Sequence, residues 1–168
     1  MIWLRAALFF LVVPGTVLGL VPAALVSYGP RPRVDAGPLR LLGLAAAAAG
    51  VGVILWCSVE FVRRGRGTAA PYDPPRELVA VGLYRWVRNP MYVAAVLAVV
   101  GEALWTGAPV LLAYAAALAI AYHLFVRLHE EPRLRRAFGP AYERYCAAVP
   151  RWLPRRPANA PPPDSAVP

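Results

Sequence analysis

Four apolar stretches dominate this chain and leave it few possible folds. They run over 4–28, 39–62, 90–105 and 109–128. A helix needs about 20 apolar residues to cross the roughly 30 Å hydrocarbon core of a bilayer. Hydrophobic residues make up 59% of the chain, more than is usual in soluble domains. We therefore predict an all-α integral membrane bundle of about four transmembrane helices, with any active site in or against that bundle.

The first stretch, 4–28, contains Pro14 and Pro22, which membrane helices tolerate where neighbouring groups satisfy the freed backbone. A cleaved signal peptide is the alternative, because Arg5 precedes the apolar run. The length of the stretch and its lack of a clear small-x-small cleavage site favour a retained helix.

In the second stretch, small residues recur at a spacing that lets another helix approach closely: Gly43, Ala47 and Gly50. We expect this helix to be buried among the others. Together with the first stretch it forms a predicted N-terminal transmembrane hairpin over 1–62.

Only Thr106, Gly107 and Ala108 separate the third and fourth stretches, which predicts a tight antiparallel helical hairpin. The polar ends of its two helices then lie on one side of the membrane. Arginines are concentrated before and after this hairpin, in 63–89 and after 126. By the positive-inside rule these regions and the N-terminus face the cytoplasm, so we predict a multi-pass protein of a bacterial inner membrane.

After Glu131 the chain becomes amphipathic. Pro132 suits the first turn of a new helix. Residues recurring at helical spacing are Leu134, Phe138, Tyr142 and Tyr145. We expect this helix on the cytoplasmic membrane surface, with a potential break at Gly139-Pro140. The functional core then covers 63–156, and 157–168, rich in Pro and Ala, is predicted to be a disordered tail.

A basic, aromatic segment, 82–92, leads directly into the third apolar stretch. Asn89 is a good N-cap and Pro90 suits the first helical position, so part of this pattern is explained by a helix start. Arg88 also suits a headgroup anchor, and Tyr84 suits the aromatic belt at the membrane interface. Read singly, these residues are consistent with structural roles.

The adjacent carboxylates Glu130 and Glu131 are harder to explain, because they repel each other at a helix end whose dipole favours cations. The predicted hairpin brings them within reach of Arg88, Asn89 and Tyr92. The result is a mixed-charge pocket at the cytoplasmic surface. Such a pocket suits a zwitterionic ligand with an aromatic base and hydroxyl groups.

Four motifs occur in a fixed order: Gly-x-Tyr-Arg-x-x-Arg-Asn-Pro-Met-Tyr, Glu-Glu, Leu-x-x-x-Phe-Gly-x-x-Tyr-x-x-Tyr and Val-Pro-Arg-x-x-Pro. With them, the chain resembles the isoprenylcysteine carboxyl methyltransferase and phospholipid methyltransferase superfamily over 72–155. The resemblance implies an integral membrane enzyme that binds S-adenosylmethionine without a Rossmann domain. The chain has no glycine-rich Rossmann fingerprint, which is consistent with that expectation.

The resemblance also implies site residues. Expected cofactor contacts are Gly82, Tyr84, Arg88, Asn89, Pro90, Tyr92, Glu130, Glu131, Tyr142 and Tyr145. Arg88, Asn89 and Glu131 are the expected catalytic residues. Relatives often carry His where this chain has Asn89, and Asn cannot act as a base near neutral pH. His123 shares a helical face with Glu130, so it is a further candidate on the cofactor side; a packed interhelical hydrogen bond is its alternative role.

The predicted function is therefore methyl transfer to a lipophilic or amphipathic acceptor: an isoprenoid-type carboxylate, a thiol, an amine or a phospholipid headgroup. A non-catalytic membrane scaffold and an NADPH-dependent membrane reductase are the alternatives. The net charge of +9 fits membrane lipids better than nucleic acid, because the arginines flank apolar segments. Cys57 and Cys146 have no close Cys or His partner in sequence, so neither a disulfide nor a metal site is predicted. No obligate protein partner is evident.

Overall fold

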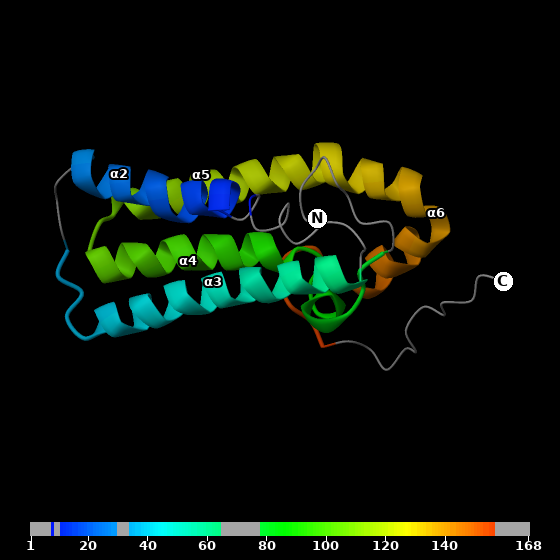
Figure 1. The fold of residues 1–168 in the computed structure, drawn as a ribbon, viewed down its shortest axis with the longest axis horizontal. Helices are drawn as coiled ribbons and strands as arrows, with labels where there is room; N and C mark the ends of the chain where they lie inside the picture. The colour runs from blue at the N-terminus through cyan, green and yellow to red at the C-terminus, as the bar shows by residue number, and fades with distance from the viewer. Residues whose placement is uncertain (1–7, 9–10, 30–33, 65–77, 157–168) are drawn as a thin grey trace.

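The computed structural model describes residues 8, 11–29, 34–64 and 78–156. These residues form helices and no strand, which confirms the predicted fold class. The elements are η1 (Gly15–Leu20), α2 (Val21–Tyr28), α3 (Leu39–Arg64), η2 (Gly82–Arg85), α4 (Pro90–Thr106), α5 (Val110–Phe125), η3 (Val126–Glu130) and α6 (Glu131–Ala148). In the bundle, α4 lies between α3 on one side and α5 with α2 on the other (Figure 1). The predicted tail lies outside the described residues, as does the segment 65–77.

Helices α3 and α4 touch backbone to backbone. A Cβ atom added at Gly101 would lie 2.5 Å from the amide nitrogen of Ala47 and from the carbonyl oxygen of Gly43. Gly50 makes an equally close approach to α4, because a Cβ there would lie 2.6 Å from the Ala94 carbonyl oxygen. The predicted close approach of another helix at these small residues is confirmed.

The expectation that α3 is buried among other helices is wrong for the described residues. Leu41 is 72% exposed and Trp56 is 55% exposed, while Ile54 and Cys57 are buried. Within the part of the chain that the structure describes, one face of α3 packs on the bundle. The remaining apolar face suits contact with lipid, which is as apolar as a neighbouring helix.

The α4–α5 hairpin forms as predicted. Gly107 ends α4 with a φ of 64°, in the left-handed region that glycine adopts without strain. A Cβ here would also clash with the Val34 carbonyl oxygen. Two residues of α4 and two of α5 form the core beside the turn: Val99, Ala103, Leu111 and Ala115.

Helix α5 does not end before the amphipathic region. It passes through the π-helical turn η3 directly into α6, with Pro132 in the first turn of α6. A wider turn relieves the clash between a proline ring and the carbonyl group four residues earlier, which explains a π-helical turn at this place. The potential break at Gly139 is confirmed: its φ of 49° and ψ of −128° are not helical, and the second half of α6 turns back (Figure 1).

Three described helices are long and apolar enough to cross a membrane, over 11–28, 39–63 and 110–148. The chain is therefore an integral membrane protein. Helix α4 is apolar but has only 17 residues, about 25 Å at 1.5 Å per residue. It reaches across a bilayer only with modest local adjustment. Which side faces the cytoplasm stays a prediction, as do the boundaries of the functional core.

Candidate active site

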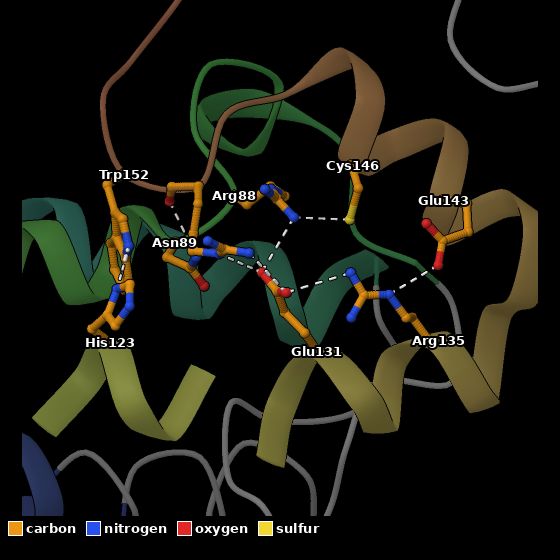
Figure 2. A network of polar contacts seen from close by, with 9 residues as sticks. Arg88, Asn89, His123, Glu131, Arg135, Glu143, Cys146 and Trp152 are labelled. Atoms are coloured by element: carbon orange, nitrogen blue, oxygen red, sulfur yellow. Dashed lines mark hydrogen bonds and ion pairs between the residues drawn. The ribbon is translucent and has the colours of Figure 1, made fainter. Parts of the chain in front are cut away.

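Glu131 is the centre of a charged cluster that joins three segments of the chain. Its side chain is 4% exposed, although it is the first residue of α6. Arg151 approaches the carboxylate with two nitrogens, Nε at 2.6 Å from Oε1 and Nη2 at 3.0 Å from Oε2. Arg88 Nη1 lies 3.2 Å from Oε1, and Arg135 Nη2 lies 3.6 Å from Oε2. In the view of Figure 2, Arg88 reaches this carboxylate from above and Arg135 reaches it from the right.

The arginines keep Glu131 ionised. Burial alone would raise the pKa of its carboxyl group, but the hydrogen bond and charge of Arg151, with the charges of Arg88 and Arg135, lower that pKa below its usual value. A buried carboxylate with this many cationic partners has a fixed position and stays negatively charged. It is poorly suited to accept a proton.

Glu130, the preceding residue, has the opposite environment. The Tyr92 hydroxyl donates a hydrogen bond of 3.0 Å to its Oε2. Burial raises the pKa of the Glu130 carboxyl; the Tyr92 hydrogen bond opposes this rise, and the charge of Glu131 adds to it. The Tyr92 ring in turn packs against Tyr122, with 4.5 Å between ring centroids. Glu130 is therefore the carboxylate that can gain a proton more easily.

Within the described part of the chain, the guanidinium of Arg88 has one nitrogen with hydrogen-bond partners and one without. Its Nη1 donates to Glu131 and also to the Cys146 sulfur at 2.9 Å. Its Nε is buried and has no hydrogen-bond partner among the described residues. Because a buried unpaired donor is costly, this nitrogen is a candidate contact for a ligand oxygen.

Asn89 occupies the N-cap position of α4, but its side chain makes no capping hydrogen bond. The predicted capping role of this side chain is therefore wrong. Its Nδ2 instead donates to the Arg151 carbonyl oxygen at 3.1 Å. The amide is used to hold the chain that follows α6 against the start of α4.

Three buried tyrosines form the wall next to the charged cluster. The Tyr145 hydroxyl donates to the Tyr84 carbonyl oxygen at 2.8 Å, which ties α6 to the turn η2. Gly82 opens this turn with a φ of 56°. Burial raises the pKa of Tyr84, Tyr142 and Tyr145, so each keeps a neutral hydroxyl group.

A cavity of about 770 Å³ joins this polar region to the interior of the bundle. Eight of the predicted contact residues line it: Tyr84, Arg88, Asn89, Tyr92, Glu130, Glu131, Tyr142 and Tyr145. Its apolar wall comes from several helices and includes Val17, Leu18, Ile54, Ala95, Tyr122 and Phe125. The structure thus brings together a polar and an apolar surface in one space. The binding role of these residues stays a prediction.

Three predicted contact residues do not line the cavity: Gly82, Pro90 and His123. His123 Nδ1 accepts a hydrogen bond of 3.1 Å from Trp152 Nε1, and the centroids of the two rings lie 5.9 Å apart. This contact is a packed hydrogen bond of the kind considered as the alternative, although its partner follows α6 instead of lying in a neighbouring transmembrane helix. Gly82 and Pro90 shape the backbone on either side of Arg88.

Sequence reasoning did not identify Arg151, Trp152 or Cys146 as part of the site. The signal for Arg151 was present in the Val-Pro-Arg-x-x-Pro motif. Because Arg151 follows the last helix, helical spacing could not predict its contact with Glu131. Among the described residues, no group of three or more His, Cys, Asp or Glu side chains could hold a metal ion.

Comparison with models of protein families gives a match. A family model described as phospholipid methyltransferase matches residues 39–141. The matched region begins with α3 and ends within α6, so it includes the contacts of Arg88 with Glu131 and of Tyr92 with Glu130. No curated protein and no solved structure matches the chain.

Proposed function

Because the chain belongs to the phospholipid methyltransferase family, we propose that it uses S-adenosylmethionine to methylate a lipophilic or amphipathic acceptor. The family makes it a membrane methyltransferase in general terms. The cofactor and the class of acceptor are the proposed part. The non-catalytic scaffold considered from the sequence is disfavoured by the family match.

The cavity is the observation that carries this proposal. One space touches both a charged, tyrosine-rich wall and an apolar wall made by membrane helices. Its volume of about 770 Å³ lies within the roughly 300–1,000 Å³ range of small-molecule sites. An amphipathic acceptor can therefore meet a polar cofactor without leaving the membrane boundary.

The residues at the polar end suit S-adenosylmethionine. The unpartnered Arg88 Nε fits the carboxylate of the cofactor. Tyr84, Tyr142 and Tyr145 offer aromatic surface for a base or a sulfonium group. When bound, the cofactor supplies an activated methyl group on its sulfonium sulfur.

The chain's main contribution is orientation and exclusion of water. Proximity and alignment of two reactants supply up to about 7–11 kcal/mol of barrier reduction, and a methyl transfer relies heavily on both. The cluster around Glu131 holds the residues that precede α4, the start of α6 and the chain after α6 together beside the cavity, which restrains its polar wall.

Glu130 is the best-placed group to take up a proton if the acceptor has to lose one. It lines the cavity, and burial raises its pKa, whereas arginines lower the pKa of Glu131. A carboxylate acceptor needs no base, but an amine, phenol or thiol does. If Glu130 takes that proton, the acceptor's reacting atom lies near the Tyr92–Glu130 pair.

Ligand titration tests the cofactor assignment. Calorimetry on the purified, detergent-solubilised chain is expected to show binding of S-adenosylmethionine and S-adenosylhomocysteine and none of NADPH. Arg88→Ala should weaken adenosyl binding at least tenfold. The control Arg85→Ala removes an exposed arginine of the same segment and should change affinity less than twofold.

Absence of adenosyl binding at submillimolar concentration overturns the proposal, and NADPH binding in its place supports the reductase alternative. For the acceptor, methyl transfer from labelled S-adenosylmethionine is measured on lipid extracts and on vesicles of defined phospholipids. Label recovered in the organic phase supports a lipophilic acceptor. Label recovered only in water-soluble products contradicts it.

A further inference from the structure

The segment that follows α6, 149–155, is hydrogen-bonded near both of its ends to the residues that precede α4; we call it the C-terminal strap. The Arg88 amide donates to the Pro150 carbonyl oxygen at 2.9 Å. The Arg155 amide donates to the Trp86 carbonyl oxygen at 3.0 Å. The strap therefore lies against one wall of the cavity, although it is outside the region matched by the family model.

Arg151 links the two polar walls of the cavity. Its guanidinium contacts both oxygens of Glu131 on α6, at 2.6 and 3.0 Å. Its carbonyl oxygen accepts the Asn89 side-chain amide at the start of α4. One residue thus restrains a carboxylate from one wall and an amide from the other.

The other two arginines around Glu131 cannot replace this restraint. Arg88 reaches only Oε1 and shares the same nitrogen with the Cys146 sulfur. Arg135 is 44% exposed and lies closer to Glu143, at 2.9 Å, than to Glu131. Only a planar guanidinium with two contacts fixes the orientation of a carboxylate, which a single contact leaves free to rotate.

The strap is also anchored to α5. Trp152, the residue after Arg151, donates its indole N–H to His123 Nδ1 at 3.1 Å. Figure 2 shows this pair at the side of the cluster away from Cys146. Since the backbone is held at Pro150 and Arg155 and the Trp152 side chain is held by His123, little freedom is left for the Arg151 side chain.

We propose that Arg151 is a positioning residue of the cofactor site: its bidentate contact orients Glu131, and its carbonyl group orients Asn89. Arg151 itself does not line the cavity, so it acts through these two residues. The inference rests on the proposed function, because cofactor affinity is what the positioning serves.

The test compares S-adenosylhomocysteine binding to the full-length wild type, Arg151→Ala, Arg151→Lys and Arg155→Ala in detergent. Arg151→Ala should lose at least tenfold in affinity. Arg151→Lys keeps the charge but not the planar fork, so it should recover only part of the loss. Arg155→Ala is the matched control, because the contact of Arg155 uses its backbone amide; it should bind within twofold of wild type.

Chemical rescue separates positioning from a general effect on folding. Millimolar guanidinium chloride should restore part of the affinity of Arg151→Ala and leave that of the wild type unchanged. If Arg151→Ala binds with wild-type affinity, the inference about Arg151 is overturned and the proposed function is not. A lowered affinity that neither guanidinium nor the Arg151→Lys substitution improves also overturns the inference. If the wild type itself does not bind S-adenosylhomocysteine, the proposed function fails first, and the inference fails with it.

Discussion

The α3–α4 contact and the Glu131 cluster both hold together segments that are distant in sequence, but they do so by opposite means. At the first, side chains are absent: Gly43, Gly50 and Gly101 let two backbones touch. At the second, long arginine side chains converge on one buried carboxylate.

The difference has consequences for what each contact tolerates. Helix association in a membrane depends on close van der Waals packing, so adding even a methyl group at the glycine contact disturbs it. The stability of a buried ion cluster depends on the pairing of opposite charges, because removal of one member leaves the other charges buried without a counter-charge. The two contacts should therefore respond differently to mutation and to pH.

The largest expected effect is that of Glu131→Ala, which leaves Arg88 and Arg151 without their carboxylate. Removing one partner of a buried ion pair typically costs about 3–5 kcal/mol. We expect a loss of this size in the free energy of unfolding, measured by denaturant titration in detergent. The control Glu143→Ala removes a carboxylate that is 58% exposed and should cost less than about 1 kcal/mol. Equal losses in the two variants would contradict the buried cluster.

Next in size is Gly101→Ala. Its new methyl group would meet the backbones of Gly43 and Ala47 at 2.5 Å, so we expect a destabilisation of about 1–3 kcal/mol. Gly52→Ala in α3 is the matched control, because a Cβ at Gly52 meets nothing within 4 Å. Since alanine favours helix by about 1 kcal/mol over glycine, Gly52→Ala should be neutral or stabilising. Destabilisation by both variants would argue against a specific contact.

A smaller effect is expected for Tyr92→Phe, which removes the hydroxyl that donates to Glu130. Loss of one such hydrogen bond is worth about 0.5–1.5 kcal/mol. The pH–rate profile of methyl transfer should also shift, because the hydrogen bond from Tyr92 favours the ionised carboxylate. Removal of this hydrogen bond should raise the pKa of Glu130, so the part of the profile that reports the ionisation of Glu130 should move to higher pH. An unchanged profile with reduced stability would limit Tyr92 to a structural role.

The smallest effect is the pH dependence of stability, because the two glutamates contribute with opposite sign. The pKa of Glu131 is lowered by folding, so its contribution is present above the usual value of 4.5 and is lost as the pH falls through the folded pKa. The pKa of Glu130 is raised, so its burial costs stability as the pH rises above 4.5. Unfolding of Glu131→Gln and Glu130→Gln between pH 3 and 8 should show slopes that differ from wild type in opposite directions. Slopes that change in the same direction would contradict these environments.

Much of the fold could be predicted because its signals are local. Hydrophobic length predicted the helices, and the short link at Gly107 predicted the α4–α5 hairpin. That hairpin was sufficient to bring Arg88 to Glu131 and Tyr92 to Glu130, as expected. The expectation that α3 is surrounded by helices failed, because an apolar sequence does not distinguish a face that packs on protein from one that meets lipid.

The side-chain partners were less predictable. Asn89 matches the composition of an N-cap, yet its amide bonds to the strap, which follows α6 and lies 62 residues away in sequence. His123 was associated with the cofactor through its helical face, but Trp152 takes its ring nitrogen. Both outcomes depend on where the chain goes after the kink at Gly139.

The sequence by itself determined the membrane bundle, the hairpin and the residues that carry charge at its polar end. These follow from apolar length, glycine positions and side-chain chemistry, which act over a few residues. Only the tertiary structure decided that the two adjacent glutamates differ. Glu131 is fixed by arginines from the segment before α4, from α6 and from the strap, whereas Glu130 bonds to Tyr92 and lines the cavity. The reason is physical: the ionisation of a carboxylate depends on its burial and on nearby charges, and chain segments far apart in sequence supply both.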